Sequence, residues 1–104
     1  MPSSKYTVRL LSIAEQDLVD LVSYFAAENP RAASAMLNHV EDSLKSLQSH
    51  PFVGRVPHNP KLTALGYRVL VIENYLVFYK VKDNVVLVHR ILHGARDLLR
   101  LLSE

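Results

Sequence analysis

Three strand-like runs joined by two short turns constrain the fold of this chain more than any other feature. The runs cover residues 67–73, 75–81 and 85–92 and are rich in Val, Ile, Leu, Tyr and Phe, which favour a pleated sheet. Asn74 separates the first two runs, and Lys82-Asp83-Asn84 separates the last two. Asn and Asp tolerate left-handed backbone and bond to their own main chain, so both breaks are typical of hairpin turns. The sequence therefore predicts a three-stranded antiparallel meander.

The chain before the meander is predicted to begin with a strand and a helix. Residues 6–10 alternate in polarity and include β-branched side chains, which indicates a strand. Ser12 is placed to cap a helix, because its hydroxyl can bond to free backbone amides while Glu15, three residues on, reaches back to it. We expect this helix to bury one apolar stripe, made of Ala14, Leu18, Leu21, Val22 and Phe25.

A second helix is expected to begin at Asn29-Pro30 and to run towards His50. Asn is a favoured N-cap residue, and Pro suits the first helical position because the amide that it lacks would have no partner there. Apolar residues then recur at three- and four-residue spacing, at Ala33, Met36, Leu37, Val40, Leu44 and Leu47. The two helices are therefore predicted to form a hairpin with one buried face.

The segment between His50 and Gly66 is the one long irregular stretch. It combines turn-forming with basic residues, namely Pro51, Gly54, Pro57, Pro60, Arg55, His58 and Lys61. Loops of more than about 12 residues without structure of their own are uncommon in compact domains and are often functional. A simple crossover from helix to sheet also explains the segment, so the sequence leaves both interpretations open.

Length and composition limit the classes of protein that the chain can form. Its 104 residues suffice for one hydrophobic core, so we expect residues 1–104 to be a single domain. The chain has no cysteine, which excludes disulfides and thiolate catalysis, and no apolar run near the roughly 18 residues of a membrane span. A signal-peptide pattern is also missing, so we expect a soluble, cytoplasmic protein without a membrane contact.

Basic residues are concentrated in the second half of the chain. Residues 1–50 hold four Lys or Arg and six Asp or Glu, whereas residues 51–104 hold eight and four, within a net charge of only +2. Such asymmetry is typical of a nucleic-acid or acidic-protein contact. Ordinary solvated charge gives the same pattern at this magnitude.

Five histidines raise the question of a metal site. His89 and His93 have the four-residue spacing that chelates a metal on a helix, but both fall in a predicted strand. Four strand residues separate them by about 13 Å, too far for shared coordination. We therefore expect neither a metal nor a cofactor.

The order of these elements and several short motifs resemble the RelE/ParE superfamily of bacterial toxins from type II toxin–antitoxin systems. The motifs include HPFVGR (50–55), GYRVL (66–70), YLVFY (75–79) and RILHGARD (90–97). The resemblance implies an α+β fold with an N-terminal strand, a two-helix hairpin, a three-stranded antiparallel meander and a short C-terminal helix. It also implies a hetero-oligomer with a cognate antitoxin, which wraps an extended and helical segment around the hydrophobic surface of the toxin.

One branch of the superfamily, similar to RelE and YoeB, cleaves mRNA in the ribosomal A site. Cleavage without a metal needs a proton to leave the 2′-hydroxyl, a proton to reach the leaving oxygen, and cations around the phosphate. Gly94 stands where the YoeB-like pattern has Tyr, and residues 50–66 contain no Glu to act as a base. The catalytic candidates for this branch are Arg68, Arg90, His93 and Arg96, and the resemblance places Arg68 and His93 where such nucleases can carry a catalytic Arg and His.

The other branch, similar to ParE, inhibits DNA gyrase and needs no catalytic set. The loop at 52–55, the strand at 75–79 and the ending at 91–93 fit this branch well, so gyrase inhibition is the first hypothesis. The alternatives are the ribosome-dependent mRNA endonuclease and an inactive antitoxin-binding module. On the gyrase-binding hypothesis, the cationic donors to the target surface are Arg55, Arg68, Arg90 and Arg96.

Strand geometry restricts both hypotheses. Arg90 and His93 have opposite parity, so they face opposite sides of the sheet unless the strand bends near Leu92. Arg68 shares its side with Leu70 and Ile72, so it is either a functional residue or a rim residue that closes the edge of the core.

Overall fold

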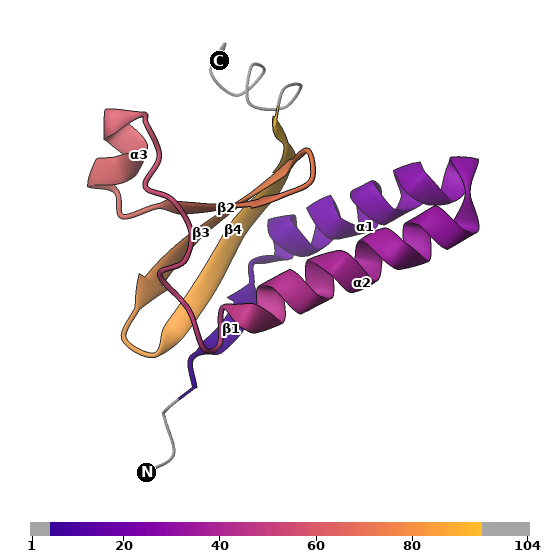
Figure 1. Ribbon diagram of the computed structural model, residues 1–104. Helices are drawn as coiled ribbons and strands as arrows, with labels where there is room; N and C mark the ends of the chain where they lie inside the picture. Colours follow the sequence, from indigo (N-terminus) through magenta and orange to yellow (C-terminus); the bar gives the residue numbers. More distant parts are fainter. Residues whose placement is uncertain (1–4, 95–104) are drawn as a thin grey trace.

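The computed structural model describes residues 5–94, which form three helices and four strands. In Figure 1 the helices α1 and α2 lie side by side next to the sheet, and α3 lies apart from them. The expected α+β class, N-terminal strand, helical hairpin and meander are confirmed. The expected C-terminal helix and Arg96 lie outside the described residues. In chain order the elements are β1 (Thr7–Leu10), α1 (Ser12–Glu28), α2 (Pro30–Ser46), α3 (Pro60–Ala64), β2 (Arg68–Ile72), β3 (Tyr75–Lys82) and β4 (Val85–His93).

The four strands form a single mixed sheet in the order β1-β4-β3-β2. β2, β3 and β4 pair antiparallel, as the meander predicted. β1 joins the far side of β4 and runs parallel to it, with residues 7–10 opposite residues 85–88. The first strand of the chain therefore pairs with the last one, and α1 and α2 form the start of the crossover between them.

Each hairpin turn of the meander consists of two residues, Glu73-Asn74 and Asp83-Asn84. Left-handed backbone falls on the first residue of each turn, with φ of 54° at Glu73 and 56° at Asp83. Both turns lie within one residue of the predicted breaks, because Glu73 joins Asn74 in the first turn and Lys82 belongs to β3. In the first turn, however, Asn74 is not the residue that takes the left-handed conformation, although Asn tolerates it better than Glu.

The start of α1 differs from the predicted capping box. The N-cap is Leu11, which has extended backbone and no side-chain cap, and Ser12 is already the first helical residue. The Leu11 N–H donates to the Val88 carbonyl of β4 at 3.0 Å, and the Leu11 carbonyl accepts from the Glu15 N–H at 3.0 Å. Leu11 thus belongs to both the sheet ladder and the first helical turn, which leaves Ser12 no capping role.

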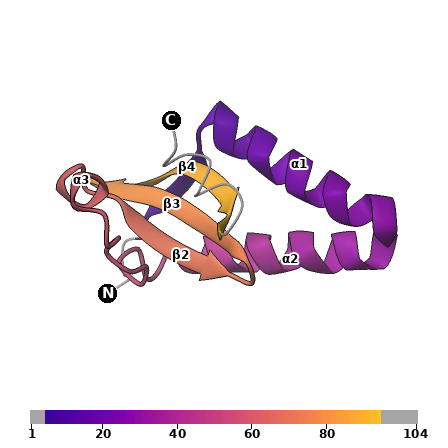
Figure 2. The same cartoon turned by 90° about the horizontal axis from the view of Figure 1, so that it is seen from above.

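The start of α2 agrees with the prediction. The Asn29 side chain accepts from the backbone N–H groups of Arg31 and Ala32 at 2.9 and 3.4 Å, and Pro30 holds the first helical position. The helix ends at Ser46, before His50. In Figures 1 and 2 the connected ends of α1 and α2 extend beyond the sheet.

Both helices bury their apolar stripes against one face of the sheet, which we call the inner face. The opposite, outer face carries the alternate residues of each strand, and the core residues of α1 and α2 pack on the inner face instead. The core combines residues of the two helices with inner-face residues of three strands: Ala14, Leu21, Met36, Val40, Leu44, Leu47, Ile72, Tyr75, Val77, Tyr79, Val86, Val88 and Ile91.

The segment before β2 is more ordered than the sequence suggested. Residues 60–64 form α3, whose N-cap Asn59 accepts from the N–H groups of Lys61 and Leu62 at 2.9 and 3.3 Å. Pro60 takes the first helical position. The Asn-Pro pair that predicted α2 therefore recurs here, and the description of residues 50–66 as irregular was wrong at this point.

A β-bulge in β4 changes which side chains reach each face. Phe78 pairs with Arg90 and Tyr79 pairs with Val88, so His89 is an extra residue in the ladder. Val88 before the bulge and Ile91 after it are both buried in the core, although their parity differs. The predicted alternation therefore holds on either side of His89 and not through it.

Replacement of Asn29 by Ala is expected to lower the free energy of unfolding by about 1 kcal/mol, because the first amides of α2 lose their acceptor. For a domain of this size the midpoint of thermal unfolding falls by roughly 5 °C. Asn38 is exposed within the same helix, so Asn38→Ala serves as the control and should leave the midpoint nearly unchanged. Equal losses in the two variants would contradict the capping role.

Candidate functional site

Arg68 holds the loop at residues 52–54 against the start of β2. Its Nη1 donates to the carbonyl of Phe52 at 3.1 Å and to the carbonyl of Gly54 at 2.9 Å. The guanidinium carbon also lies 5.1 Å from the centre of the Phe52 ring. Arg68 therefore has a structural role, because its donors fix a neighbouring loop.

Tyr79 of β3 fixes the same loop from the core side. Its fully buried hydroxyl accepts a hydrogen bond from the Gly54 N–H at 2.9 Å. A Cβ at position 54 would lie 2.5 Å from that hydroxyl, so the close approach requires glycine. Burial raises the pKa of Tyr79 above its usual value, which keeps the hydroxyl protonated. Phe52 and Val53, with 55% and 59% of their surfaces exposed, are thus displayed on an anchored loop.

Arg90 forms a two-pronged ion pair with Asp17 of α1. Its Nε and Nη2 donate to the two carboxylate oxygens at 2.8 and 3.0 Å. The same carboxylate accepts the Ile91 N–H at 2.9 Å. β1 pairs with β4 only as far as Val88, so Asp17 takes the place of a neighbouring strand beyond that point. Arg90 therefore connects the helical layer to the sheet.

The three candidate nuclease residues that lie within residues 5–94 are not gathered into one cluster. Arg68 lies on the inner-face side of β2, across from Tyr79 of β3. Arg90 lies on β4, across from Phe78 of β3. His93 lies across from Tyr75, with ring centres 5.4 Å apart. Arg90 and His93 face opposite sides of the sheet, as their parity predicted. Arg68 and Arg90 are held by separate structural contacts on separate strands.

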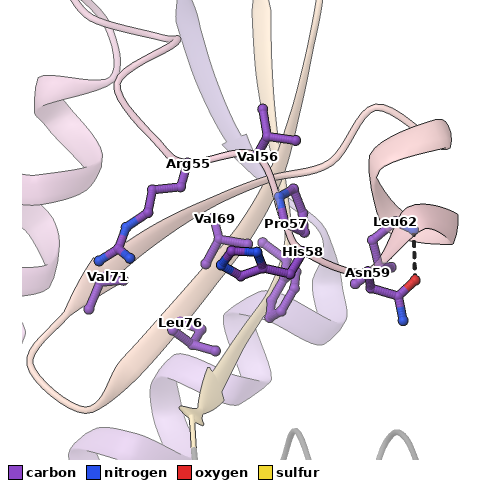
Figure 3. A pocket seen from close by; sticks show the side chains of 10 residues that line it. Arg55, Val56, Pro57, His58, Asn59, Leu62, Val69, Val71 and Leu76 are labelled. Atoms are coloured by element: carbon purple, nitrogen blue, oxygen red, sulfur yellow. Dashed lines mark hydrogen bonds between the residues drawn. The ribbon is translucent and has the colours of Figure 1, made fainter.

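Arg55 borders an apolar groove of about 310 Å³ on the outer face (Figure 3). Its backbone N–H and carbonyl bond to Val69 at 2.8 Å, which adds a one-residue bridge to the free edge of β2. In Figure 3, Arg55 and Val71 lie at one end of the groove and Leu62 of α3 at the other. The remaining lining residues are Val56, Pro57, His58, Asn59, Val69, Leu76 and Phe78. An apolar floor with one cation at its rim suits a protein segment.

The outer face also holds a polar cluster that the sequence did not reveal. The Tyr67 hydroxyl and His89 Nδ1 are 3.1 Å apart, and the Lys80 Nζ lies 4.5 Å from the centre of the Tyr67 ring. His89 Nε2 is buried without a hydrogen-bond partner in the described part of the chain. Burial, and then the charge of Lys80, lower the pKa of His89. Only the bulge brings His89 beside Tyr67, and no sequence signal marks a bulge.

Residues 5–94 contain no group of three or more His, Asp or Glu side chains arranged to hold a metal ion. In the same range, no helix has the length and apolar character needed to cross a membrane. The exposed groove lined by Val56 and Leu62 was also missed from the sequence. Its signal was present, since these apolar residues stand in an otherwise polar loop.

Comparison with known proteins places these features in a family. Residues 8–98 match the family described as the ParE toxin of the type II toxin–antitoxin system, parDE. The chromosomal ParDE TA system from P. aeruginosa has a similar structure, with a TM-score of 0.72 and 21% identity over 88% of this chain and 98% of that one. The toxin–antitoxin complex RelBE2 from Mycobacterium tuberculosis is similar at a TM-score of 0.60 and 26% identity, over 86% and 98%. No curated protein sequence matches the chain.

Replacement of Asp17 by Ala is expected to cost about 2 kcal/mol of unfolding free energy, because one change removes the acceptor of three hydrogen bonds at the α1–β4 contact. Urea unfolding followed by far-UV circular dichroism measures the change. Asp42 is exposed on α2, so Asp42→Ala controls for the loss of a helical carboxylate. A difference of less than about 0.5 kcal/mol between the two variants would show that Asp17 does not clamp the layers.

Acid is expected to destabilise the fold through His89. Because the folded-state pKa of His89 lies below 6.5, the unfolded chain binds this proton at higher pH than the folded chain does. Its contribution to stability is therefore complete above about pH 6.5 and is lost as the pH falls through the folded pKa. Unfolding midpoints between pH 8 and 5 should fall less steeply in His89→Gln than in the wild type. The exposed His58→Gln should keep the wild-type slope, and a wild-type slope in His89→Gln would refute the assignment.

Proposed function

Because this chain belongs to the ParE toxin family of type II toxin–antitoxin systems, we propose that it arrests growth by binding DNA gyrase. The protein acts on this proposal as a binding inhibitor, and its exposed loop and groove supply the contacts. The mechanism needs no bond to be made or broken by the toxin. Its free energy comes from burying apolar surface around a few cationic donors.

The engagement of Arg68 and Arg90 in structural contacts is the observation that supports binding over RNA cleavage. A metal-independent nuclease needs cations, a base and an acid around one phosphate. Here Arg68 donates hydrogen bonds to two loop carbonyls, and Arg90 is paired with Asp17. His93 packs near Tyr75 on the inner-face side. Bringing these groups around one phosphate would require breaking contacts that hold the fold together.

The surface that we assign to the target combines Phe52, Val53 and Arg55. The first two are large, exposed apolar side chains on the loop anchored by Arg68 and Tyr79. Arg55 follows directly and stands at the rim of the groove. Exposed aromatic, aliphatic and Arg side chains on a fixed backbone form the type of cluster that dominates protein–protein binding energy.

A cognate antitoxin is the second proposed partner. Two apolar surfaces suit the helical and extended parts of such a chain. A groove of about 490 Å³ on α1 is lined by Leu18, Val19 and Val22, among others, and accepts a helix. On the outer face, Val71 is 45% exposed on β2, an edge strand whose bridge to the loop involves Val69, so an extended segment can pair there.

A ribosome-dependent mRNA endonuclease is the alternative. The similarity to the RelBE2 complex at 26% identity is the observation that favours it. The purified chain should be tested in parallel in a gyrase supercoiling reaction and by primer extension on mRNA from programmed ribosomes. Blocked supercoiling with intact mRNA supports gyrase binding. Discrete cuts in the ribosomal A site, with unchanged supercoiling, would replace it with the nuclease.

Replacement of Arg55 by Ala is expected to raise the concentration needed for half-inhibition of gyrase about tenfold, equivalent to roughly 1.4 kcal/mol of binding energy. Arg55 is exposed and holds the sheet edge through its backbone, so the thermal midpoint should stay within about 2 °C of the wild type. Arg31→Ala removes an equal charge from the exposed surface of α2 and is the matched control. Unchanged inhibition by Arg55→Ala would remove this residue from the target surface.

A further inference from the structure

The strands and the two long helices differ completely in charge. The four strands carry five Lys or Arg and no Asp or Glu, whereas α1 and α2 carry six Asp or Glu and two Lys or Arg. The asymmetry between the halves of the sequence is therefore also an asymmetry in space. The helical layer is thus net acidic, and the sheet is net basic.

Four of the five strand cations lie on the outer face. Arg90 is paired with Asp17, and the other three form what we call the outer cationic patch: Arg9, Lys80 and Lys82. Arg9 of β1 pairs with Leu87 of β4, which pairs with Lys80 of β3, so the two cations lie in one row across the sheet. Neighbouring strands are about 4.8 Å apart, which places Arg9 and Lys80 roughly 10 Å apart at their Cα atoms. Lys82 lies two residues further along the same strand, about 7 Å away.

The outer cationic patch differs from the other strand cations, Arg68 and Arg90, in the contacts of its charged groups. Arg68 and Arg90 bond to the 52–54 loop and to Asp17. In contrast, the described residues 5–94 contain no carboxylate within salt-bridge distance of Arg9, Lys80 or Lys82. Arg9 and Lys82 are exposed. Lys80 lies against the Tyr67 ring. Asp83, in the turn that follows β3, is the acidic residue next to Lys82 in the sequence.

We propose that the outer cationic patch binds the phosphate backbone of DNA, so that the toxin contacts the DNA held by gyrase as well as the enzyme. The choice of DNA rests on the proposed gyrase target. Charge complementarity supports the contact itself. Duplex DNA presents a phosphate about every 1.7 Å of its axis, so a patch roughly 10 Å wide faces several phosphates. A row of cations across β1, β4 and β3 suits a continuous, uniformly charged partner.

An acidic protein segment is less suitable for this patch. Such a segment binds best where a groove or a strand edge supplies main-chain and apolar contacts, and those features lie near Val69 and Val71 on β2. The row that contains Arg9 and Lys80 crosses the other side of the sheet, on β1, β4 and β3. Phosphates need only the cations and the polar groups beside them, such as the Thr7 hydroxyl.

The test measures binding of the full chain to a fluorescent 20-base-pair DNA duplex by anisotropy at several salt concentrations. The double variant R9Q/K82Q is expected to bind about tenfold more weakly at low salt. The slope of log affinity against log salt should also decrease in magnitude by about two, because two phosphate contacts are lost. R31Q/K45Q removes the same two charges from exposed positions on α2 and should change affinity less than twofold.

Several results would overturn the proposal. These are no binding by the wild-type chain, equal weakening in both double variants, or tighter binding of an RNA duplex with the same dependence on Arg9 and Lys82. Loss of affinity for DNA-free gyrase in R9Q/K82Q, with unchanged DNA binding, would make the patch a protein contact. Supercoiling by wild-type toxin is measured separately, so failure of the gyrase target and failure of the DNA contact give different results.

Discussion

The parallel pairing of β1 with β4 is the constraint on which the rest of the structure depends. It joins the start of the described chain to its last strand, and the Leu11 N–H bond to Val88 places the first turn of α1 at the end of the ladder. Where β1 ends, Asp17 accepts the next available amide of β4 and pairs with Arg90. The helical hairpin is thus fixed to the sheet by backbone hydrogen bonds at the start of α1 and by its apolar stripes, which pack on the inner face.

Local sequence signals predicted the elements well and their long-range contacts poorly. The two hairpin turns, the Asn29-Pro30 helix start and the apolar stripes depend on nearby residues. The helix start was located correctly, the turns to within one residue, and most of the stripe residues lie in or against the core. The capping box failed because a bond between Leu11 and Val88, distant in sequence, defines the start of α1. The bulge at His89 and the parallel position of β1 are likewise products of pairing between strands, which periodicity does not encode.

Arginine illustrates the same limit for the site. From the sequence, Arg55, Arg68 and Arg90 were all candidate target-binding residues. In the fold, Arg68 binds loop carbonyls, Arg90 binds a helical carboxylate, and Arg55 remains exposed at a groove. The partners that distinguish them come from the Phe52–Gly54 loop and from α1, so only the tertiary structure separates the cation at the surface from the two that hold layers together. Arg9, which the sequence did not single out, belongs with the exposed group.

The anchored loop at residues 52–54 has a thermodynamic consequence for any partner that covers it. Its backbone is held from two sides, by the Tyr79 hydroxyl and by the Arg68 guanidinium, before a partner arrives. Flexible loops lose conformational entropy when they bind, and this loss subtracts directly from affinity. Phe52 and Val53 are already positioned, so little of the free energy gained by burying them is lost to ordering the loop. Natural variation in affinity for a partner is then expected to appear mainly as differences in the lifetime of the complex.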